Sequence, residues 1–194
     1  GRAELITAAY RRSFFDAGRG PGLASCRAGN VIGGGGWSED RLIPDIARAV
    51  LGGKPVVIRN PHSLRPWQHV LEPISGYLNV ARCLAGGEPR WADAWNFGPG
   101  PDADITVAEL TRQMLHHWGR GEMRIQEDPN APHEAVLLRL DSRKAKSLLN
   151  WKPVLNAQEA IKLTVDWYRA WGENRSSVRD LTEKQIMDYF RAVV

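Results

Sequence analysis

Short apolar segments of strand length alternate along the chain with longer segments that have one apolar helical face. Residues 23–32, 56–58 and 94–97 have the composition of buried strands, and amphipathic segments at 41–51, 72–84 and 107–118 lie between and after them. Parallel strands need a crossover connection, which is usually a helix, so this alternation predicts an α/β protein with a mainly parallel sheet. The expected strands are residues 23–32, 56–58, 68–71, 94–97, 123–126 and 136–140.

Capping residues in the sequence predict where several of the helices begin. A capping box of Thr106 and Glu109 predicts a helix with Val107, Leu110, Met114 and Trp118 on its apolar face. A second pair, Thr182 and Gln185, predicts the start of the last helix, and Asp141 or Ser142 caps the one that ends at Leu149. The other expected helices are residues 1 to about 18, 41–51, 72–84 and 156–171.

Composition narrows the class of protein. The 194 residues are 43% hydrophobic and 25% charged, as in a folded domain with a real core. No apolar run approaches the roughly 20 residues of a membrane helix, and we expect no membrane association. Two cysteines give no disulfide framework, so we expect a cytoplasmic protein. The net charge of +4 comes from scattered bases, which argues against a nucleic-acid partner.

The chain opens inside a helical pattern, with Ile6, Ala9, Tyr10 and Phe14 on one face and no cap residue before them. We therefore expect the sequence to belong to a longer protein, although a cleaved leader or an expression boundary would look the same.

The stretch RAGNVIGGGGW, residues 27–37, raises the possibility of a phosphate-binding loop. It does not match G-x-G-x-x-G, because the last position of that pattern falls on Ser38, and no lysine follows as in a P-loop. A flexible connector is one interpretation of the glycines. The other rests on Asn30, which we expect at the carboxyl end of a parallel strand, where α/β proteins bind ligands.

Two further segments carry groups suited to anions. In IRNPHSLRPWQHV, Arg65-Pro66-Trp67 places a guanidinium beside an aromatic ring on a stiff segment, which suits phosphate, although a surface turn has the same composition. In AWNFGP, Asn96 follows the same strand-to-glycine pattern as Asn30, or belongs to an ordinary turn.

Catalytic and metal-binding motifs are absent from the sequence. His133-Glu134 does not begin an H-E-x-x-H motif, because residue 137 is Leu, and we expect no metal site. There is no G-x-S-x-G motif, and no tyrosine is followed four residues later by lysine. The sequence therefore predicts binding groups without catalytic machinery.

Taken in order, these segments resemble the extended short-chain dehydrogenase/reductase superfamily, and within it the nucleotide-sugar dehydratases of the CDP-glucose 4,6-dehydratase family. Four segments are similar in sequence to those of that family: GNVIGGG, VIRNPHSLRPWQHVLEP, WNFGP and PHEA. The resemblance spans nearly the whole chain. The motifs that carry it are Arg27-x-x-Asn30-Val31-x-Gly33, Leu42-Ile43-Pro44, Arg65-x-Trp67, Asn96-x-Gly98, Asn150-Trp151-Lys152-Pro153 and Trp167-Tyr168.

The resemblance implies an NAD-dependent lyase that converts CDP-D-glucose to CDP-4-keto-6-deoxy-D-glucose and water. It implies that the Tyr-x-x-x-Lys pair and the glycine-rich NAD fingerprint precede residue 1, so this chain holds no catalytic residue and is inactive alone. It implies a homodimer formed through the first helix. The residues that it assigns to the CDP-sugar are Asn30, Arg41, Leu42, Pro44, Val57, Arg65, Asn96 and His133, with Arg27 and Asn30 beside the cofactor.

The implied fold is the carboxyl-terminal part of a Rossmann-like NAD-binding protein with a smaller mixed α/β lobe for the sugar nucleotide. Residues 1–32 would end the Rossmann domain, 33–172 would form mainly the lobe, with 72–98 returning to the Rossmann sheet, and 173–194 would be a helical appendage. Gly36 and Val136-Leu137 depart from the family pattern, which leaves the pocket detail there open. The alternatives are a non-catalytic sugar-nucleotide-binding module and a related epimerase or dehydratase with another base or sugar.

Overall fold

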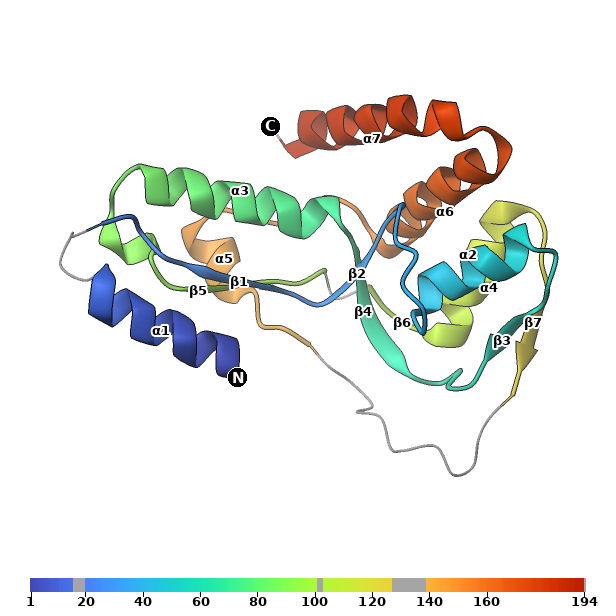
Figure 1. Cartoon of the computed structure of the whole chain (residues 1–194), viewed down its shortest axis with the longest axis horizontal. Helices are drawn as coiled ribbons and strands as arrows, with labels where there is room; N and C mark the ends of the chain where they lie inside the picture. The colour runs from blue at the N-terminus through green and yellow to red at the C-terminus, as the bar shows by residue number, and fades with distance from the viewer. Residues whose placement is uncertain (16–19, 101–102, 127–138, 194) are drawn as a thin grey trace. The chain divides into compact units, whose positions relative to one another are not determined.

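The computed structural model describes residues 1–15, 20–100, 103–126 and 139–193, and these form two compact units (Figure 1). Unit 1 consists of Gly1–Ala28, Glu72–Gly98 and Leu140–Pro153, and unit 2 consists of Gly29–Leu71, Pro99–Arg139 and Val154–Val194. The helices and strands confirm the α/β class.

Unit 1 is built on one parallel strand pair. Strand β1 pairs with β5 so that Arg27 lies opposite Asn96. Strand β5 buries Trp95 and Phe97, and β1 contributes the half-buried Cys26. The core of this unit also contains Trp91 and Trp151. The elements of this unit are α1 (Arg2–Phe14), β1 (Ser25–Ala28), nearly all of α3 (Leu71–Ala85), η2 (Pro89–Trp91), β5 (Ala94–Phe97) and α5 (Arg143–Leu148).

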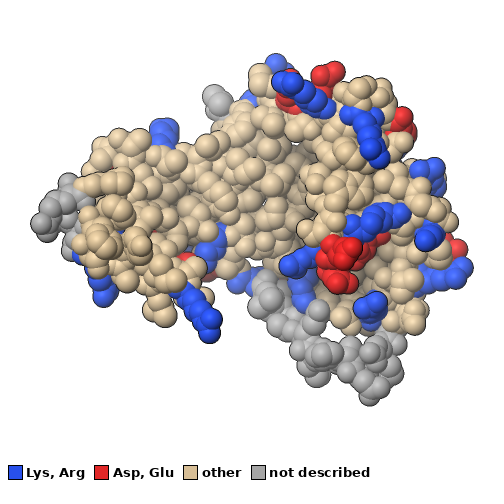
Figure 2. Space-filling model, in the orientation of Figure 1, with Lys and Arg blue, Asp and Glu red and all other residues tan. Residues whose placement is uncertain are grey.

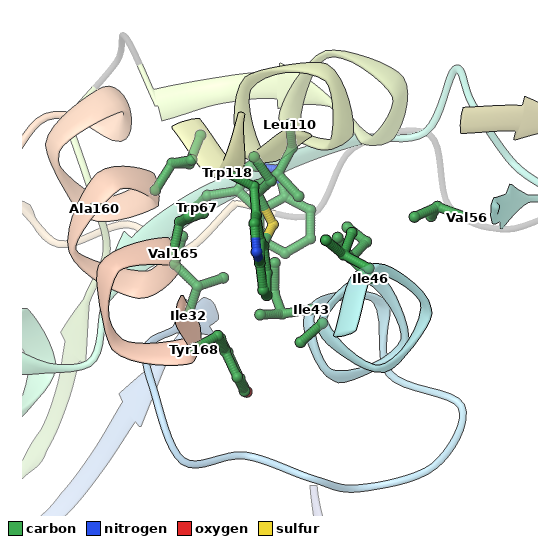
Figure 3. Close-up of a cluster of buried hydrophobic side chains, with 14 of the residues drawn as sticks. Ile32, Ile43, Ile46, Val56, Trp67, Leu110, Trp118, Ala160, Val165 and Tyr168 are labelled. Carbon is green, nitrogen blue, oxygen red and sulfur yellow. The ribbon is translucent and has the colours of Figure 1, made fainter. Parts of the chain in front are cut away.

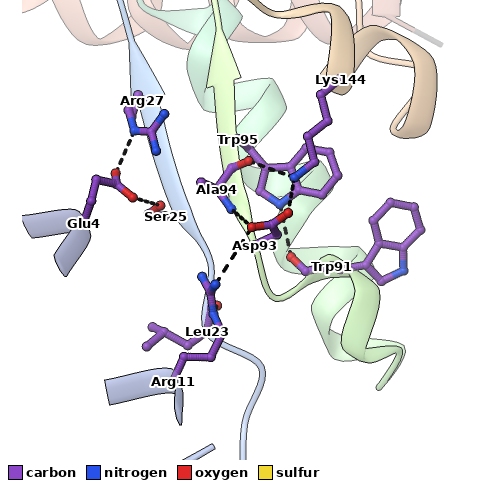
Figure 4. A network of polar contacts seen from close by, with 10 residues as sticks. All are labelled: Glu4, Arg11, Leu23, Ser25, Arg27, Trp91, Asp93, Ala94, Trp95 and Lys144. Atoms are coloured by element: carbon purple, nitrogen blue, oxygen red, sulfur yellow. Dashed lines mark hydrogen bonds and ion pairs between the residues drawn. The ribbon is translucent and has the colours of Figure 1, made fainter. Parts of the chain in front are cut away.

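Polar contacts fasten helices α1 and α5 to this strand pair (Figure 4). Arg11 of α1 donates to the carbonyl of Leu23 over 3.0 Å and lies 3.9 Å from the carboxylate of Asp93. Lys144 of α5 forms an ion pair with the same carboxylate and lies 4.3 Å from the centre of the Trp95 ring. One carboxylate next to β5 therefore contacts both helices.

Unit 2 contains two small sheets. In the first sheet, β4 lies between β2, which is parallel to β4, and β6, which is antiparallel to β4. In the second sheet, β3 and β7 are parallel. The strands are β2 (Asn30–Ile32), β3 (Val56–Ile58), β4 (Leu64–His69), β6 (Asp104–Thr106) and β7 (Met123–Ile125). The helices are α2 (Leu42–Leu51), α4 (Val107–Trp118), α6 (Ala157–Glu173), η4 (Arg175–Ser177) and α7 (Val178–Val193).

The core of unit 2 joins these sheets to helices α2, α4 and α6 (Figure 3). Leu110, Met114 and Trp118 of α4 lie inward as the helical spacing predicts. Helix α6 contributes Ile161, Val165 and Tyr168, which are completely buried. They belong to the helical face that the sequence predicts to be apolar. Helix α6 also contacts β2 and β4, which line the pocket of this unit as Tyr168 of α6 does.

Several details differ from the sequence-based expectation, among them strand β6, which was not expected. Residues 23–32 form two strands rather than one, because β1 pairs with β5 whereas β2 pairs with β4, and Gly29 separates them. Helix α7 begins at Val178, so Thr182 and Gln185 lie inside it and do not cap it. The strand expected at 68–71 is shifted to Leu64–His69, and most of the strand expected at 136–140 lies outside the described residues.

The compact units also divide the chain differently in several segments, since residues 29–32 and 173–194 both lie in unit 2. Residues 72–98 lie in unit 1, with the Rossmann-like strand pair, and so do residues 140–153, which the sequence-based division assigned to the lobe. The reason is packing: α5 contacts β5, and the Trp151 ring lies 5.0 Å from that of Phe97 in a T-shaped arrangement.

Candidate functional site

Unit 2 holds a pocket of about 820 Å³ in front of strands β2 and β4. Six residues predicted to bind a sugar nucleotide line it: Asn30, Arg41, Leu42, Pro44, Val57 and Arg65. They come from four separate places in the sequence, and the fold brings them together. The lining also includes Ser38, Asp40, Arg59, Asn60, Ser63, Trp67, Val107 and Tyr168.

Strands β2 and β4 supply the floor of this pocket. Asn30 opens β2 directly opposite Trp67 of β4, in parallel register. Asn30 is therefore the first residue of a second strand, two positions beyond the end of β1, and not the last residue of a long one. Its side chain is half-buried, and its amide offers both a donor and an acceptor for a ligand.

Helix α2 supplies one wall. Arg41 stands at the N-cap in an extended conformation, and its side chain makes no capping bond. Pro44 lies in the first turn, where the missing amide proton costs no helical hydrogen bond. Asp45 forms an ion pair with Arg48 of the next turn, so the acidic group at this end of the helix already has a cationic partner.

Arginines give the pocket its cationic character. Arg65 is half-buried in β4, and its Nη1 donates to the carbonyl of Leu64 over 2.9 Å. Arg59 and Arg41 line the same pocket. On the face shown in Figure 2, Lys and Arg lie in several separate places, some of them beside Asp or Glu. Two aspartates, Asp40 and Asp45, also line the pocket, so its lining carries three cationic and two anionic side chains. The arginines are the groups suited to an anion.

Arg27 and Asn96 lie in unit 1, where they contact each other and not the pocket of unit 2. Arg27 donates to Asn96 Oδ1 over 2.8 Å. It also donates to Glu4 Oε1 over 2.7 Å (Figure 4). Hydrogen bonds from Arg27 and Ser25 lower the pKa of Glu4 to about 2. Asn96 also donates to the carbonyl of Asp141 over 3.0 Å. Both side chains thus have protein partners, and their assignment to ligands stays a prediction.

His133 lies outside the described residues, and its predicted contact with the nucleotide stays a prediction. Sequence reasoning missed Tyr168 as a pocket residue, because its position on the inward face of α6 is also that of a core side chain. It missed Asp40 and Ser63 because polar residues in connecting segments carry no periodic signal. Asp40 has a left-handed backbone, with φ of 56°.

A buried histidine lies at the end of β4, next to the pocket strands. His69 is 2% exposed, and burial lowers its pKa to about 4. Its Nδ1 accepts a hydrogen bond from the amide of Leu71 over 3.4 Å, and its Nε2 has no hydrogen-bond partner among the described residues. The imidazole is therefore neutral at pH 7.

Metal-binding geometry is absent from the described part of the chain, where no three His, Cys, Asp or Glu side chains form a group able to hold an ion. The helices of that same part are each too short or too polar to span a membrane.

Comparison with known proteins adds to this geometry. No protein-family model matches the chain. The CDP-glucose 4,6-dehydratase of Salmonella typhimurium (strain LT2) is 43% identical over 196 residues, an alignment that covers 99% of this chain and 54% of that enzyme. The chain thus spans about half the length of the curated relatives it matches.

Solved structures show the same fold. The dTDP-glucose 4,6-dehydratase DesIV from Streptomyces venezuelae, with NAD bound, matches 92% of this chain and 51% of its own, with a TM-score of 0.70 and 24% identity. The dTDP-glucose 4,6-dehydratase from Bacillus anthracis, in complex with NAD, matches 92% of this chain and 52% of its own, with a TM-score of 0.69 and 20% identity.

The chain has the fold of the part of these solved dehydratases that it covers, and this fold agrees with the sequence similarity. In sequence the chain is similar to CDP-glucose 4,6-dehydratase, as the motifs between Arg27 and Tyr168 predict.

Proposed function

We propose that the pocket of unit 2 binds the nucleoside diphosphate of a CDP-sugar, and that the complete protein is an NAD-dependent CDP-glucose 4,6-dehydratase. The observation that carries this proposal is the pocket itself, in which six predicted ligand residues meet in a chain 43% identical to a CDP-glucose dehydratase. The products would be CDP-4-keto-6-deoxy-D-glucose and water.

Each part of the pocket suits one part of such a substrate. The Arg65 guanidinium and the Asn30 amide, on adjacent strands, suit the oxygens of a diphosphate. Leu42, Pro44 and Val57 present apolar surface to the flat face of a base. The role of this chain is to bind and orient the substrate, and we assign none of its residues to proton or hydride transfer.

The glycine stretch at 33–36 is poorly suited to bind the pyrophosphate of NAD. The glycine stretch at 33–36 lies against side chains of unit 2, since a Cβ at Gly34 would lie 2.0 Å from Cγ of Trp167 and one at Gly33 would lie 2.8 Å from Cγ1 of Val70. That backbone therefore has neighbours where a cofactor pyrophosphate would need space. NAD supplies the hydride chemistry in this family. We propose that it serves the complete enzyme and that this chain contributes only the backbone near Arg27 and Asn30.

Titration of the 194-residue chain with CDP tests the binding site. Isothermal calorimetry is expected to show one CDP per chain, with weaker binding of UDP, dTDP and CMP. Arg65→Ala should weaken CDP binding by about tenfold or more, since a charge-assisted hydrogen bond contributes about 1.5–3 kcal/mol. Arg65→Lys should recover only part of the loss, because it keeps the charge and loses the planar fork.

Arg124→Ala is the matched control, because Arg124 of β7 is exposed and does not line the pocket. Equal binding of CMP and CDP would contradict a diphosphate site. Absence of CDP binding by the unaltered chain would contradict the proposed function. Co-expression with an amino-terminal half from a related dehydratase, followed by an assay for the 4-keto product, tests the activity.

We also propose a homodimer formed through α1 and a cytoplasmic location. The apolar side chains Leu5, Ile6, Tyr10 and Phe14 of α1 are between 53% and 74% exposed, which supports a partner on that helix. Both cysteines are free thiols, which supports a reducing compartment.

A further inference from the structure

The glycine stretch from Gly33 to Gly36 connects β2 to helix α2 and forms one side of the pocket. Gly33, Gly36 and Ser38 line the pocket, whereas Gly34 and Gly35 face helix α6. A run of glycines has the largest backbone freedom of any sequence, so it takes one conformation only where neighbouring groups hold it. We call the segment Gly33–Ser38 the glycine loop.

Tyr168 of α6 holds the middle of the glycine loop. Its hydroxyl donates to the carbonyl of Gly36 over 2.5 Å, across 132 positions in the sequence. The ring is buried in the core of unit 2, and Tyr168 also lines the pocket. The hydroxyl is thus fixed by the core, and the carbonyl that it holds belongs to the pocket wall.

Trp167, the preceding residue, interlocks with the same loop. Its indole occupies the space beside Gly34, where an added Cβ would lie 2.0 Å from Cγ and 2.1 Å from Cδ2. The indole is itself fixed, since its Nε1 donates to Thr182 of α7 over 2.9 Å and its ring stacks on that of Trp171 at 5.7 Å. Only glycine fits at position 34 while this indole keeps its place.

Helix α2 holds the far end of the glycine loop. Arg48 donates to the carbonyl of Trp37 over 2.9 Å and to that of Ser38 over 3.1 Å. The Trp37 ring lies edge-on to that of Tyr168 at 5.1 Å. The backbone carbonyls of Gly36, Trp37 and Ser38 therefore accept hydrogen bonds from side chains of helices α6 and α2.

We propose that Tyr168 and Trp167 are positioning residues for the nucleotide pocket: they fix the glycine loop in the shape that receives the sugar nucleotide. This inference rests on the proposed function of the pocket. If the glycine loop is already fixed, binding of the sugar nucleotide does not have to restrict its backbone. Loss of the contacts that fix the loop should therefore weaken binding of the sugar nucleotide. Because the Gly36 backbone is exposed, water can replace the lost hydroxyl, and global stability should change little.

The first test compares two tyrosine variants in CDP titrations of the 194-residue chain. Tyr168→Phe removes the hydroxyl and keeps the ring, and it should weaken CDP binding by about five- to tenfold, as expected for one hydrogen bond. Tyr189→Phe removes the same atom from a buried tyrosine of α7 that does not line the pocket, and it should leave the dissociation constant unchanged. Melting temperatures of both variants show whether stability accounts for any difference.

The second test uses the interlock at Gly34. Gly34→Ala should reduce CDP binding by at least tenfold, because the added methyl and the indole cannot both keep their positions. The double variant Gly34→Ala with Trp167→Leu has room for the methyl and should recover part of the Gly34→Ala loss, although it does not restore the indole contacts. Gly100→Ala is the control, since nothing lies within 4 Å of the added atom there.

The outcomes separate this inference from the proposed function. If the unaltered chain binds CDP and Tyr168→Phe and Gly34→Ala bind it equally well, the positioning role is wrong and the proposed function stands. The positioning role is also wrong if Tyr189→Phe loses as much CDP affinity as Tyr168→Phe. If the unaltered chain does not bind CDP, the proposed function is overturned and the positioning role with it.

Discussion

His69 is the residue of unit 2 whose protonation should depend most on folding. Burial lowers its pKa from 6.5 to about 4, because a charged imidazole would lose its hydration at a 2% exposed position. A histidine with a lowered folded-state pKa binds its proton more readily in the unfolded chain. Its contribution to stability is therefore complete above pH 6.5 and is lost as the pH falls from 6.5 towards 4.

Urea unfolding at pH 7.5 and pH 5 should show this loss. Full protonation of His69 would cost about 3 kcal/mol, from about 1.4 kcal/mol per pKa unit, and about half of that should be lost by pH 5. His69→Gln should remove most of this pH dependence, whereas the exposed His116→Gln should keep it. An unchanged slope in His69→Gln would show that His69 is not the titrating group.

Residues also show what sequence patterns can and cannot reveal about the site. Arg41, Leu42, Pro44 and Arg65 belong to motifs with distinctive local chemistry, and the structure places them around one pocket. Asn96 has the same strand-to-glycine pattern as Asn30, yet it lies in unit 1 and bonds to Arg27. The local pattern did not locate the strand end at Asn30, which begins β2. It also does not specify which neighbours the fold brings to either asparagine.

At the scale of elements, the sequence predicts the buried faces of amphipathic helices well. It predicts the residues at which helices begin and end less well. The faces of α4 and α6 are confirmed because burial repeats at the helical period. The start of α7 was predicted wrongly at Thr182, since a threonine followed by glutamine three positions later also occurs inside helices. There Thr182 accepts from Trp167 and Gln185 donates to the carbonyl of Leu163, both across to α6.

Helix α6 should depend on its amino-terminal cap. Asn156 accepts from the amide of Glu159 over 2.9 Å, and the Glu159 carboxylate accepts from the amide of Asn156 over 2.8 Å. Asn156→Ala should lower the free energy of unfolding by about 1 kcal/mol, and Asn156→Asp, which keeps an acceptor oxygen, should change it little. Urea unfolding measures both. Equal losses in the two variants would assign the effect to something other than the cap.

At the scale of the whole molecule, the solved structures and the two units agree on an α/β fold. Unit 1 has the parallel β1–β5 pair, and unit 2 has mixed pairing around a ligand-sized pocket. The resemblance spans both units, with 99% of the chain aligned to one CDP-glucose dehydratase. The division into units was less accessible from sequence, because residues 140–153 join unit 1 through contacts with distant segments, such as that of Trp151 with Ser75 across 76 positions.

Helix α1 leads to the last prediction, which concerns assembly. None of its residues is buried, and Leu5, Ile6, Tyr10 and Phe14 together present an apolar surface to solvent in the isolated chain. Burial of such side chains contributes roughly 1.5–3 kcal/mol each, which favours a partner on this face, and we propose a second copy of the helix. Sedimentation velocity should therefore show a concentration-dependent dimer, and Ile6→Glu should shift it to monomer because a carboxylate would be buried without a partner. The exposed Arg12→Glu is the matched control and should still dimerise. A chain that stays monomeric at all concentrations would leave α1 without a second copy, and the homodimer proposal would then be wrong.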